Sequence, residues 1–491
     1  MTHPNHLEEH MLSMSVRDIL EATGASRVAG PCDGVVRSVT LDSRQAAEGV
    51  AFVAFAGERV DGNAFASEAL ARAATVVLTG PAPKGCAEAA ERHGCALLRA
   101  EGDDGEEFLL RLAGAWRRLN PQWTVVGVTG SVGKTTTKDM LAAGLRARFR
   151  VHATAGNFNN LIGLPLTLLS ADPSDEVVVA EMGMNHAGEL SRLAACARPT
   201  VALITNVGTS HIGLLGSRES IARAKAEIVG GMRPSSSAQG AVRPCLALTS
   251  DNDFAALIED EYAAPAGVEV LHVGGRPCDD VRAGGIALDD GGLPRFELSF
   301  ADGWSEPCTL GMPGRHVVSD VLLAMAICDR LGVDRHDALD RIARMPQTHM
   351  RLEVVTAPGR PRMIDDSYNA SPSSVAAALD VLCSMACTGR RVAVLGEVGE
   401  LGDEAPRLHG YIGAYAAAKP LDLLVLVGTH DAAAMAEAAL TMGFSEDRME
   451  RVDDVQAALD LIAPVLGEDD LVLAKASRAS GLDRFVKGVL A

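Results

Sequence analysis

Apolar and polar residues in the first hundred positions alternate with helical spacing in some stretches and with strand spacing in others. Residues 16–23 have the helical pattern, and the hydroxyl of Ser15 can cap the first turn. The patterns predict a helix at 16–23, strands at 35–41 and 50–56, a helix at 64–74 and a strand at 76–78. We therefore expect a small α/β domain over 1–103, which ends at a linker-like acidic sequence, Gly102-Asp103-Asp104-Gly105.

The middle of the chain consists of short apolar runs separated by helical segments. Strands are predicted at 125–128, 177–180, 201–205 and 245–249, and a strongly apolar helix at 319–331. Such alternation is typical of a mostly parallel, doubly wound sheet, which binds ligands at the carboxyl ends of its strands. Between 232 and 310, paired glycines and a Pro-Ser-rich stretch indicate a small β appendage. The predicted central domain spans 104–345.

The last part of the chain repeats the alternation. Strands are predicted at 363–365, 392–395, 423–427 and 471–474, with helices at 376–385 and 432–442. This pattern predicts a second doubly wound, Rossmann-like domain over 346–491. The expected fold is therefore α/β with three domains, of which the central one is P-loop ATPase-like.

Net charge and cysteine usage restrict the possible partners. The 491 residues include 45 basic and 64 acidic side chains, and the net charge of −19 disfavours a nucleic-acid surface. Residues 1–15 contain no apolar leader, and no run approaches the roughly 18 apolar residues of a membrane span. We expect a cytoplasmic protein without membrane insertion. Ten cysteines without a C-x-x-C pair predict reduced thiols rather than a zinc site or disulfides.

The strand predicted at 125–128 leads into a glycine-rich turn and a helix that begins near Thr135. Glycines allow the turn to approach an anion, and the first N–H groups of the helix point at it unpaired. Lys134 can reach terminal phosphates, and the Thr135 hydroxyl can bind Mg²⁺. The full P-loop pattern has glycine where this chain has Val128, so a strand-turn-helix with an incidental lysine is the alternative. We interpret the segment as an ATP site formed by Thr129, Gly130, Ser131, Val132, Gly133, Lys134, Thr135 and Thr136.

Polar residues also follow the next predicted strands. Asn157, Asn159 and Asn160 lie in a loop whose amides suit a polar substrate, although such loops are more often structural. Glu181 ends the strand at 177–180, where it can be the acidic partner of the P-loop Mg²⁺ or cap a helix. His211 follows the strand at 201–205. We predict that it binds metal, and the alternative is a satisfied, partly buried histidine.

Two other sites have ordinary explanations. Ser43 and Arg44 lie in a loop that can bind a phosphate, but a solvated turn is the favoured interpretation. Lys225 lies on a helix predicted at 218–230, where a lone lysine is usually a solvated cation.

In the last domain, polar residues follow the first predicted strand. The Asp366 carboxylate suits a ribose, and the start of the next helix suits an anion. Asn369 and Ser371 are candidate substrate contacts in the same loop, with helix capping as the alternative. The loops at 396–402 and 475–478 are expected to face the same crevice.

These motifs form an ordered series that resembles the Mur ligases over roughly residues 35–480. The series is TGSVGKTT, NFNNLIGLP, EMGMNHAGEL, TSHIGLLGS, ARAKAEI, PGRH, MRLE, DDSYNASPSS and LGEVGELG. The GKT motif is shared by many ATP-dependent amide ligases. The motifs NFNNLIGLP, EMGMNHAGEL and DDSYNASP are similar to those of the branch of the family that adds D-alanyl-D-alanine.

The resemblance implies roles for residues around ATP. Lys134 and Thr135 are expected to bind the phosphates and Mg²⁺. Glu181 and His211 are expected to be metal ligands, and Lys225 to be carbamylated and to hold a second Mg²⁺. Arg351 and Asp366 are expected to contact ATP from the third domain. Two asparagines that the family commonly has near the adenine are replaced, and Asp320 is the remaining candidate for the exocyclic amine.

The resemblance also implies the substrates and the reaction. UDP-N-acetylmuramoyl-tripeptide is expected to contact Ser43, Arg44 and residues 157–160, and D-alanyl-D-alanine the third domain. A monomer would use ATP and Mg²⁺ to form an acyl phosphate, which the amine then attacks. Two other classes remain: a P-loop ATPase or kinase that releases phosphate without an amine, and a catalytically inactive binding module. The presence of the residues expected at the phosphates and the metal disfavours the second class.

Overall fold

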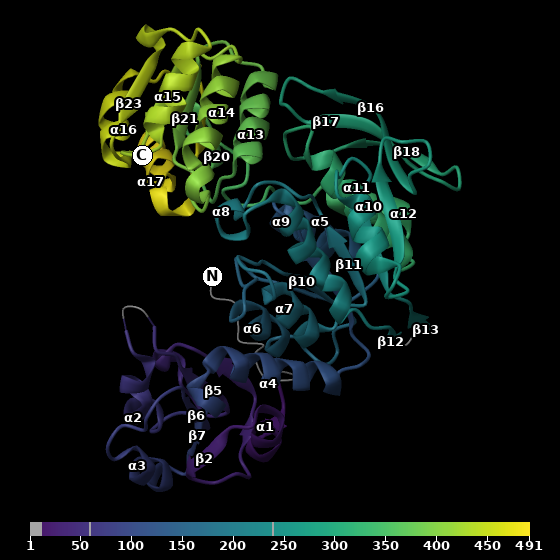
Figure 1. Ribbon diagram of the computed structural model, residues 1–491, viewed down its shortest axis with the longest axis vertical. Helices are drawn as coiled ribbons and strands as arrows, with labels where there is room; N and C mark the ends of the chain where they lie inside the picture. Colours follow the sequence, from purple (N-terminus) through teal and green to yellow (C-terminus); the bar gives the residue numbers. More distant parts are fainter. Residues whose placement is uncertain (1–11, 58–59, 238–239) are drawn as a thin grey trace.

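Three large sheets, each with helices packed on it, follow one another along the chain and along the long axis of the molecule (Figure 1). The computed structural model describes residues 12–57, 60–237 and 240–491. Most of the N-terminal segment predicted to lack an apolar leader lies outside these residues. The predicted three-domain α/β architecture is confirmed.

The first domain has a five-stranded sheet in the order β2-β7-β6-β5-β4, in which only β2 is antiparallel to its neighbour. Its strands are β2 (Ser26–Ala29), β4 (Ser38–Thr40), β5 (Val50–Ala54), β6 (Thr75–Leu78) and β7 (Ala96–Arg99), and its helices are α1 (Val16–Thr23), α2 (Ala66–Ala69) and α3 (Cys86–His93). The predicted α1 is confirmed, and Ser15 forms a capping box with Asp18.

Two predictions in this domain need correction. The predicted strand at 35–41 is two short strands, because β3 (Val35–Val36) pairs with β1 (Met14–Ser15) while β4 joins the large sheet. The predicted helix at 64–74 begins earlier and is shorter, since a 3-10 turn at Gly62–Phe65 runs into the four residues of α2, which ends at Ala69. Short elements of this kind depend on the neighbours they pair with, so their apolar spacing alone does not give their bounds.

The central domain has a nine-stranded sheet in the order β18-β17-β16-β15-β14-β11-β8-β10-β9. Its parallel strands are β8 (Thr124–Thr129), β9 (Val151–Ala153), β10 (Val177–Glu181), β11 (Val201–Ile204), β14 (Cys245–Thr249) and β15 (Glu269–Gly274). The predicted β appendage is the other end of the same sheet, where β16 (Val281–Leu288) follows β15 and β17 (Pro294–Phe300) and β18 (Ser305–Thr309) run antiparallel. A small separate hairpin joins β12 (Ser235–Ser237) and β13 (Gly240–Val242).

Helices cover both faces of the central sheet because successive residues of each strand point to opposite sides. On β8, Val125 belongs to the core on one face, and Val126 belongs to the core on the other. The helices of this domain are α4 (Gly105–Leu119), α5 (Lys134–Leu145), α6 (Gly163–Leu169), α7 (Glu189–Ala197), α8 (Ile212–Leu215), α9 (Arg218–Ala226), α10 (Ala255–Ile258), α11 (Val317–Arg330) and α12 (Arg335–Ala343). The carboxyl ends of β8, β10 and β11 therefore meet at one edge of a sheet that is buried on both faces.

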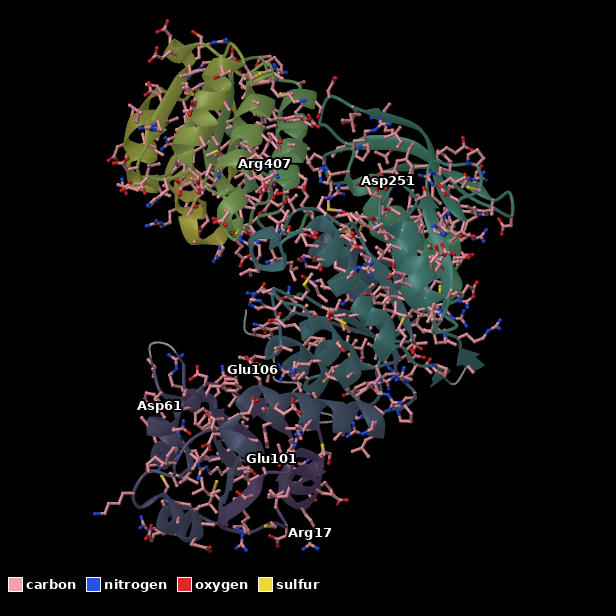
Figure 2. All side chains as sticks on the ribbon, viewed as in Figure 1. Arg17, Asp61, Glu101, Glu106, Asp251 and Arg407 are labelled. Carbon is pink, nitrogen blue, oxygen red and sulfur yellow. The ribbon has the colours of Figure 1, made fainter. Side chains whose placement is uncertain are left out.

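The junction between the first two domains is a helix rather than an extended linker. Asp104, predicted to lie in the linker, caps α4 by accepting a hydrogen bond from the Glu107 backbone. In Figure 1, α4 runs along the border between the two domains. Glu106, labelled in Figure 2, lies at the start of α4, and its carboxylate is 3.8 Å from the Arg192 guanidinium of α7.

The third domain has a six-stranded sheet in the order β19-β20-β24-β21-β22-β23, parallel except for β19. Its strands are β19 (Glu353–Val355), β20 (Arg362–Asp366), β21 (Arg391–Gly396), β22 (Leu423–Val427), β23 (Met449–Val452) and β24 (Leu471–Lys475), and its helices are α13 (Pro372–Ser384), α14 (Ala405–Ala417), α15 (Ala432–Thr441), α16 (Val455–Ile462) and α17 (Asp483–Leu490). The predicted strands and the helices α13 and α15 are confirmed, whereas α14, α16 and α17 were not predicted.

Two absences can be stated for the part of the chain that the structure describes. All ten cysteines lie in it and are free thiols, in agreement with the sequence. No helix among the described residues is both long and apolar enough to span a membrane.

Candidate functional site

The predicted strand-turn-helix is present. β8 ends at Thr129, α5 begins at Lys134, and the turn between them contains two glycines with positive φ, 151° at Gly130 and 85° at Gly133. A Cβ atom on Gly130 would lie 1.8 Å from Oγ1 of Thr205, at the end of β11. Position 130 therefore requires glycine, both for its backbone conformation and for lack of space. The turn also leaves the first N–H groups of α5 without helical partners.

A cavity of about 400 Å³ lies between this turn and the third domain. The residues predicted from sequence that line it are Ser131, Val132, Gly133, Lys134, Thr135, Thr136, Asn157, Asn159, Asn160, Glu181, His211, Asp320, Arg351, Asp366, Asn369 and Ser371. Four other predicted residues do not line it: Thr129 and Gly130, at the root of the turn, and Ser43 and Arg44, in the first domain. Lys225 is buried and does not line it either.

The Lys134 ammonium is held over the turn. Its Nζ donates to the carbonyl oxygens of Gly130, at 2.8 Å, and Ser131, at 3.4 Å. Burial lowers the pKa of this lysine, and the nearby Glu181 carboxylate opposes that effect. A phosphate bound on the turn would therefore be an additional hydrogen-bond acceptor for the Lys134 ammonium.

Glu181 has the features of a cation ligand. It ends β10, where its neighbour across the sheet is Val128, and its side chain is buried. One carboxylate oxygen accepts a hydrogen bond of 2.8 Å from Nδ2 of Asn159, and the other has no partner among the described residues. A buried carboxylate oxygen without a partner is costly, and a bound cation would satisfy it.

His211 contacts the third domain. Its Nδ1 lies 2.6 Å from Oε2 of Glu400, and both residues have left-handed backbone conformations, with φ of 63° and 64°. The interaction with His211 is the main cause of a lowered pKa for the Glu400 carboxyl. A carboxylate on one ring nitrogen leaves the other nitrogen for a different ligand, as is common for metal-binding histidines.

Lys225 is not the solvated cation that a lone helical lysine usually is. Its side chain on α9 is only 2% exposed. Burial, assisted by the charge of Lys134, lowers its pKa well below the ordinary value. Within the described parts of the chain, no cluster of three or more His, Cys, Asp and Glu side chains could hold a metal, so Glu181 and His211 would need further ligands.

Asp320 lies on α11 against the phosphate-binding turn. Its Oδ1 accepts a hydrogen bond of 3.0 Å from the Thr137 hydroxyl and would be 2.7 Å from a Cβ atom on Gly133. Burial raises the pKa of Asp320 to about 7. The side chain is thus a partly protonated group beside the turn at neutral pH.

The third domain supplies an ion pair to the cavity. Nζ of Lys475, at the end of β24, lies 2.5 Å from Oδ2 of Asp366, at the end of β20, and 3.1 Å from the carbonyl oxygen of Asn369. Asp366 is therefore partnered by Lys475 before any ribose is bound. Ser371 caps α13 in a capping box with Ser374, so the capping alternative is present in the structure.

Two guanidinium groups lie over the ring of Tyr368. The Arg351 guanidinium carbon is 4.2 Å and that of Arg478 is 5.6 Å from the ring centroid. Arg351 lies between Met350 and Leu352, which both have positive φ. The strained turn and the aromatic ring hold Arg351 at the cavity wall.

The Ser43-Arg44 loop resembles a self-contained turn. The Arg44 guanidinium pairs with Asp42 at 2.7 Å, and its side chain is 86% exposed. This pair lowers the pKa of Asp42 to about 2. The exposed Arg44 guanidinium is accessible to a phosphate, but it already forms an ion pair with the Asp42 carboxylate of its own loop.

Sequence reasoning did not assign roles to Lys475, Glu400, Tyr368 and Arg478, although all four line the cavity. Lys475 could have been found by the rule that selected Glu181, because it also is a charged residue at the carboxyl end of a buried strand. The expectation that the loops at 396–402 and 475–478 face this crevice is confirmed by Glu400, Lys475 and Arg478, but no local signal gives the partner of Glu400, which is on another domain.

Family models match three parts of the chain. They are the Mur ligase family catalytic domain at 35–113, the Mur ligase middle domain at 128–328 and the Mur ligase glutamate ligase domain at 350–478. Two curated proteins named UDP-N-acetylmuramoyl-tripeptide–D-alanyl-D-alanine ligase align with 98% of the chain. The one from Bacillus subtilis (strain 168) is 32% identical and 99% covered, and the one from Mycobacterium tuberculosis (strain CDC 1551 / Oshkosh) is 35% identical and 98% covered.

Solved structures agree with these relatives. A crystal structure of MurF from Acinetobacter baumannii has a TM-score of 0.84 and 29% identity, over 98% of this chain and 100% of that one. MurF ligase from Thermotoga maritima in complex with ADP has a TM-score of 0.76 and 26% identity, over 93% of this chain and 97% of that one.

Proposed function

Because the chain belongs to the Mur ligase family, we propose that it is the ligase that joins D-alanyl-D-alanine to UDP-N-acetylmuramoyl-tripeptide. The reaction uses ATP and completes the cytoplasmic precursor of peptidoglycan. The observation that carries this proposal is the single cavity in which the phosphate-binding turn of the central domain faces the DDSYNASP loop of the third domain. A site for phosphoryl transfer and a site for an amine are thereby adjacent.

The chain's own residues fit each step of the reaction. The C-terminal carboxylate of the tripeptide attacks the γ-phosphorus of ATP, and ADP leaves. The N–H groups at the start of α5 and the Lys134 ammonium stabilise the charge that develops on the phosphoryl oxygens. The amine of the dipeptide then attacks the acyl carbon of the acyl phosphate and loses a proton, and inorganic phosphate leaves. Enclosure between two domains keeps water from the acyl phosphate.

Mg²⁺ fits the residues present on one side of the cavity. The Thr135 hydroxyl, the open oxygen of Glu181 and His211 would hold it, and it would neutralise phosphate charge. The UDP-sugar-peptide is proposed to contact Asn157, Asn159 and Asn160 together with Ser43 and Arg44 of the first domain. The third domain is proposed to hold the dipeptide, with Asn369 and Ser371 beside it. A monomer suffices for this arrangement, since one chain forms the whole cavity.

Lys225 is proposed to be carbamylated and to hold a second Mg²⁺. A carbamate forms from a neutral amine, and burial favours the neutral form of this lysine. Lys225→Ala should lose activity that short-chain carboxylic acids partly restore, with a dependence on acid size. The role should be abandoned if the folded variant keeps full activity, or if no acid restores it.

The proposed function is tested by phosphate release with each combination of UDP-muramoyl peptide and amine. We expect turnover only when ATP, Mg²⁺, the tripeptide substrate and D-alanyl-D-alanine are all present. Efficient turnover of D-glutamate with the muramoyl-alanine precursor would contradict the assignment. Phosphate release without any amine would instead indicate an ATPase.

A further inference from the structure

D-Alanyl-D-alanine has a terminal carboxylate that takes no part in the reaction. The identity of the side chain that binds this carboxylate, which rests on the proposed function, follows from the charges in the cavity. A carboxylate that enters the cavity is stabilised by a positively charged side chain in the cavity wall. Four lysine and arginine side chains line the cavity within the described residues: Lys134, Arg351, Lys475 and Arg478. The choice among them depends on which charges are already engaged.

Three of the four are committed to other parts of the site. Lys134 lies on the phosphate-binding turn, and Lys475 is paired with Asp366. Arg351 is the arginine that the family resemblance assigns to ATP, and its guanidinium carbon lies 4.2 Å from the Tyr368 ring centroid. The remaining cation is Arg478.

Arg478 is held at the cavity wall without an acidic partner. Its guanidinium lies 5.6 Å from the ring centroid of Tyr368, and Nη1 is 4.0 Å from the sulfur of Met350. No ion pair of Arg478 is found in the part of the chain that the structure describes. The charge of Arg478 helps to lower the pKa of Asp483, but the Asp483 carboxylate forms its ion pair with Lys487, at 2.9 Å. Apart from the one that faces the Met350 sulfur, the N–H donors of Arg478 are therefore available to a ligand.

The length of the dipeptide separates its amine from its carboxylate. Its amine must reach the acyl phosphate, which forms beside the turn and Arg351. Two extended residues span about 7 Å, so the carboxylate lies well away from the phosphate. Arg351 and Arg478 both lie over the Tyr368 ring, so two cations are close together in this part of the cavity wall.

We infer that Arg478 is a specificity-determining residue that binds the terminal carboxylate of D-alanyl-D-alanine. A planar guanidinium can donate two parallel hydrogen bonds to a carboxylate, and the Tyr368 ring supports it from one side. The residue selects amines that have an anionic end at the distance of a dipeptide.

The test compares D-alanyl-D-alanine with its amide, D-alanyl-D-alaninamide, which lacks the charge but keeps the shape. The wild-type enzyme should have a kcat/KM at least about tenfold lower for the amide, the scale of one hydrogen bond to a charged group. Arg478→Gln should lose about as much with the normal dipeptide and discriminate little between the two amines. Arg478→Lys should restore part of the discrimination, and the KM for ATP should stay the same in all variants.

Arg484→Gln is the matched control, since Arg484 is an exposed arginine of the same segment whose Nε contacts the Gly481 carbonyl. It should discriminate as the wild type does. An Arg478→Gln variant with a normal unfolding temperature that still prefers the carboxylate by the wild-type ratio would overturn the inference. If the wild-type enzyme does not turn over D-alanyl-D-alanine at all, the proposed function itself fails, which is a different outcome.

Discussion

At the scale of single residues, burial changes the ionisation of the groups around the cavity. Lys134, Lys225 and Lys475 all have lowered pKa values, and burial is the largest cause for each. The three amines have different partners. Lys475 has a carboxylate partner, Lys134 has carbonyl oxygens, and the side-chain amine of Lys225 has neither a hydrogen bond nor an ion pair within the described residues.

Removal of the Lys134 ammonium should reduce turnover strongly. Lys134→Ala removes a positioned positive charge from the phosphoryl transition state, so we expect kcat to fall at least about a hundredfold. Steady-state phosphate release measures this. Lys487→Ala, which breaks an exposed ion pair on α17, should stay near wild type. Near wild-type activity of Lys134→Ala would show that another group holds the phosphates.

Asp320 should make stability dependent on pH. Its pKa rises from 3.8 to about 7 in the folded protein, so between these values the folded state holds a proton that the unfolded state releases. The free energy of unfolding should therefore fall as pH rises from about 4 to about 7, by up to about 1.4 kcal/mol per pH unit from this group.

The variant Asp320→Asn isolates that contribution, because its amide oxygen can still accept from the Thr137 hydroxyl. Urea unfolding without nucleotide, at several pH values, should show a smaller decrease for Asp320→Asn than for the wild type. Parallel profiles for the two proteins would rule out this origin of the pH dependence.

At the scale of elements, the turn between β8 and α5 depends on glycine more than on any side chain. A Cβ atom at Gly130 meets Thr205 Oγ1 at 1.8 Å, in a backbone conformation that side chains rarely adopt. Gly130→Ala should therefore lower stability by about 1–3 kcal/mol and weaken binding of an ATP analogue, since the turn must move.

Gly188→Ala provides the comparison for this element. Gly188 has a φ of 87°, but a Cβ atom added there would have no atom within 4 Å, so the substitution costs only backbone strain. Thermal unfolding should show the smaller change for Gly188→Ala, and ATP-analogue binding should be unaffected. Equal effects of the two substitutions on nucleotide binding would mean that the close approach to Thr205 is unimportant.

At the scale of the whole molecule, the third domain contacts the central domain around the cavity. The Gly213 backbone donates to the Glu400 carbonyl at 3.2 Å, beside the contact between His211 and Glu400. A second contact lies at the β16–β17 turn, where the Ala386 backbone donates to the Asp290 carbonyl at 2.8 Å. In Figure 1, α8 lies between the two domains.

Glu400→Ala should shift the domains toward a more open arrangement. The Glu400 side chain is 50% exposed, so we expect a change of no more than about 1 kcal/mol, or roughly fivefold in the ratio of closed to open forms. Small-angle X-ray scattering should give a larger radius of gyration. Asp403→Ala removes an exposed charge from the same loop and should leave the radius unchanged. The same radius for all three proteins would argue against this contact as a determinant of closure.

Local sequence pattern is enough to predict the parts of this protein whose structure depends on neighbouring residues. The apolar run at 125–128 with its glycines predicts a strand and an anion-binding turn, and Glu181 follows the end of a buried strand, so local pattern is enough for both. Helix α1 was predicted to the residue because Ser15 and Asp18 form its cap locally. Amphipathic contrast does not explain which helices of the third domain were predicted, because the unpredicted α16 and α17 have more of it than the predicted α13 and α15.

The partners of the charged groups depend on how segments distant in the sequence pack together. Asp366 and Lys475 are 109 positions apart and meet because β20 and β24 are adjacent in the sheet. His211 and Glu400 meet because two domains are packed together. The burial of Lys225, which turns an ordinary helical lysine into a candidate for modification, likewise depends on what covers α9. Sequence spacing contains no information on contacts between distant segments, and the energies of buried charges are set by those contacts.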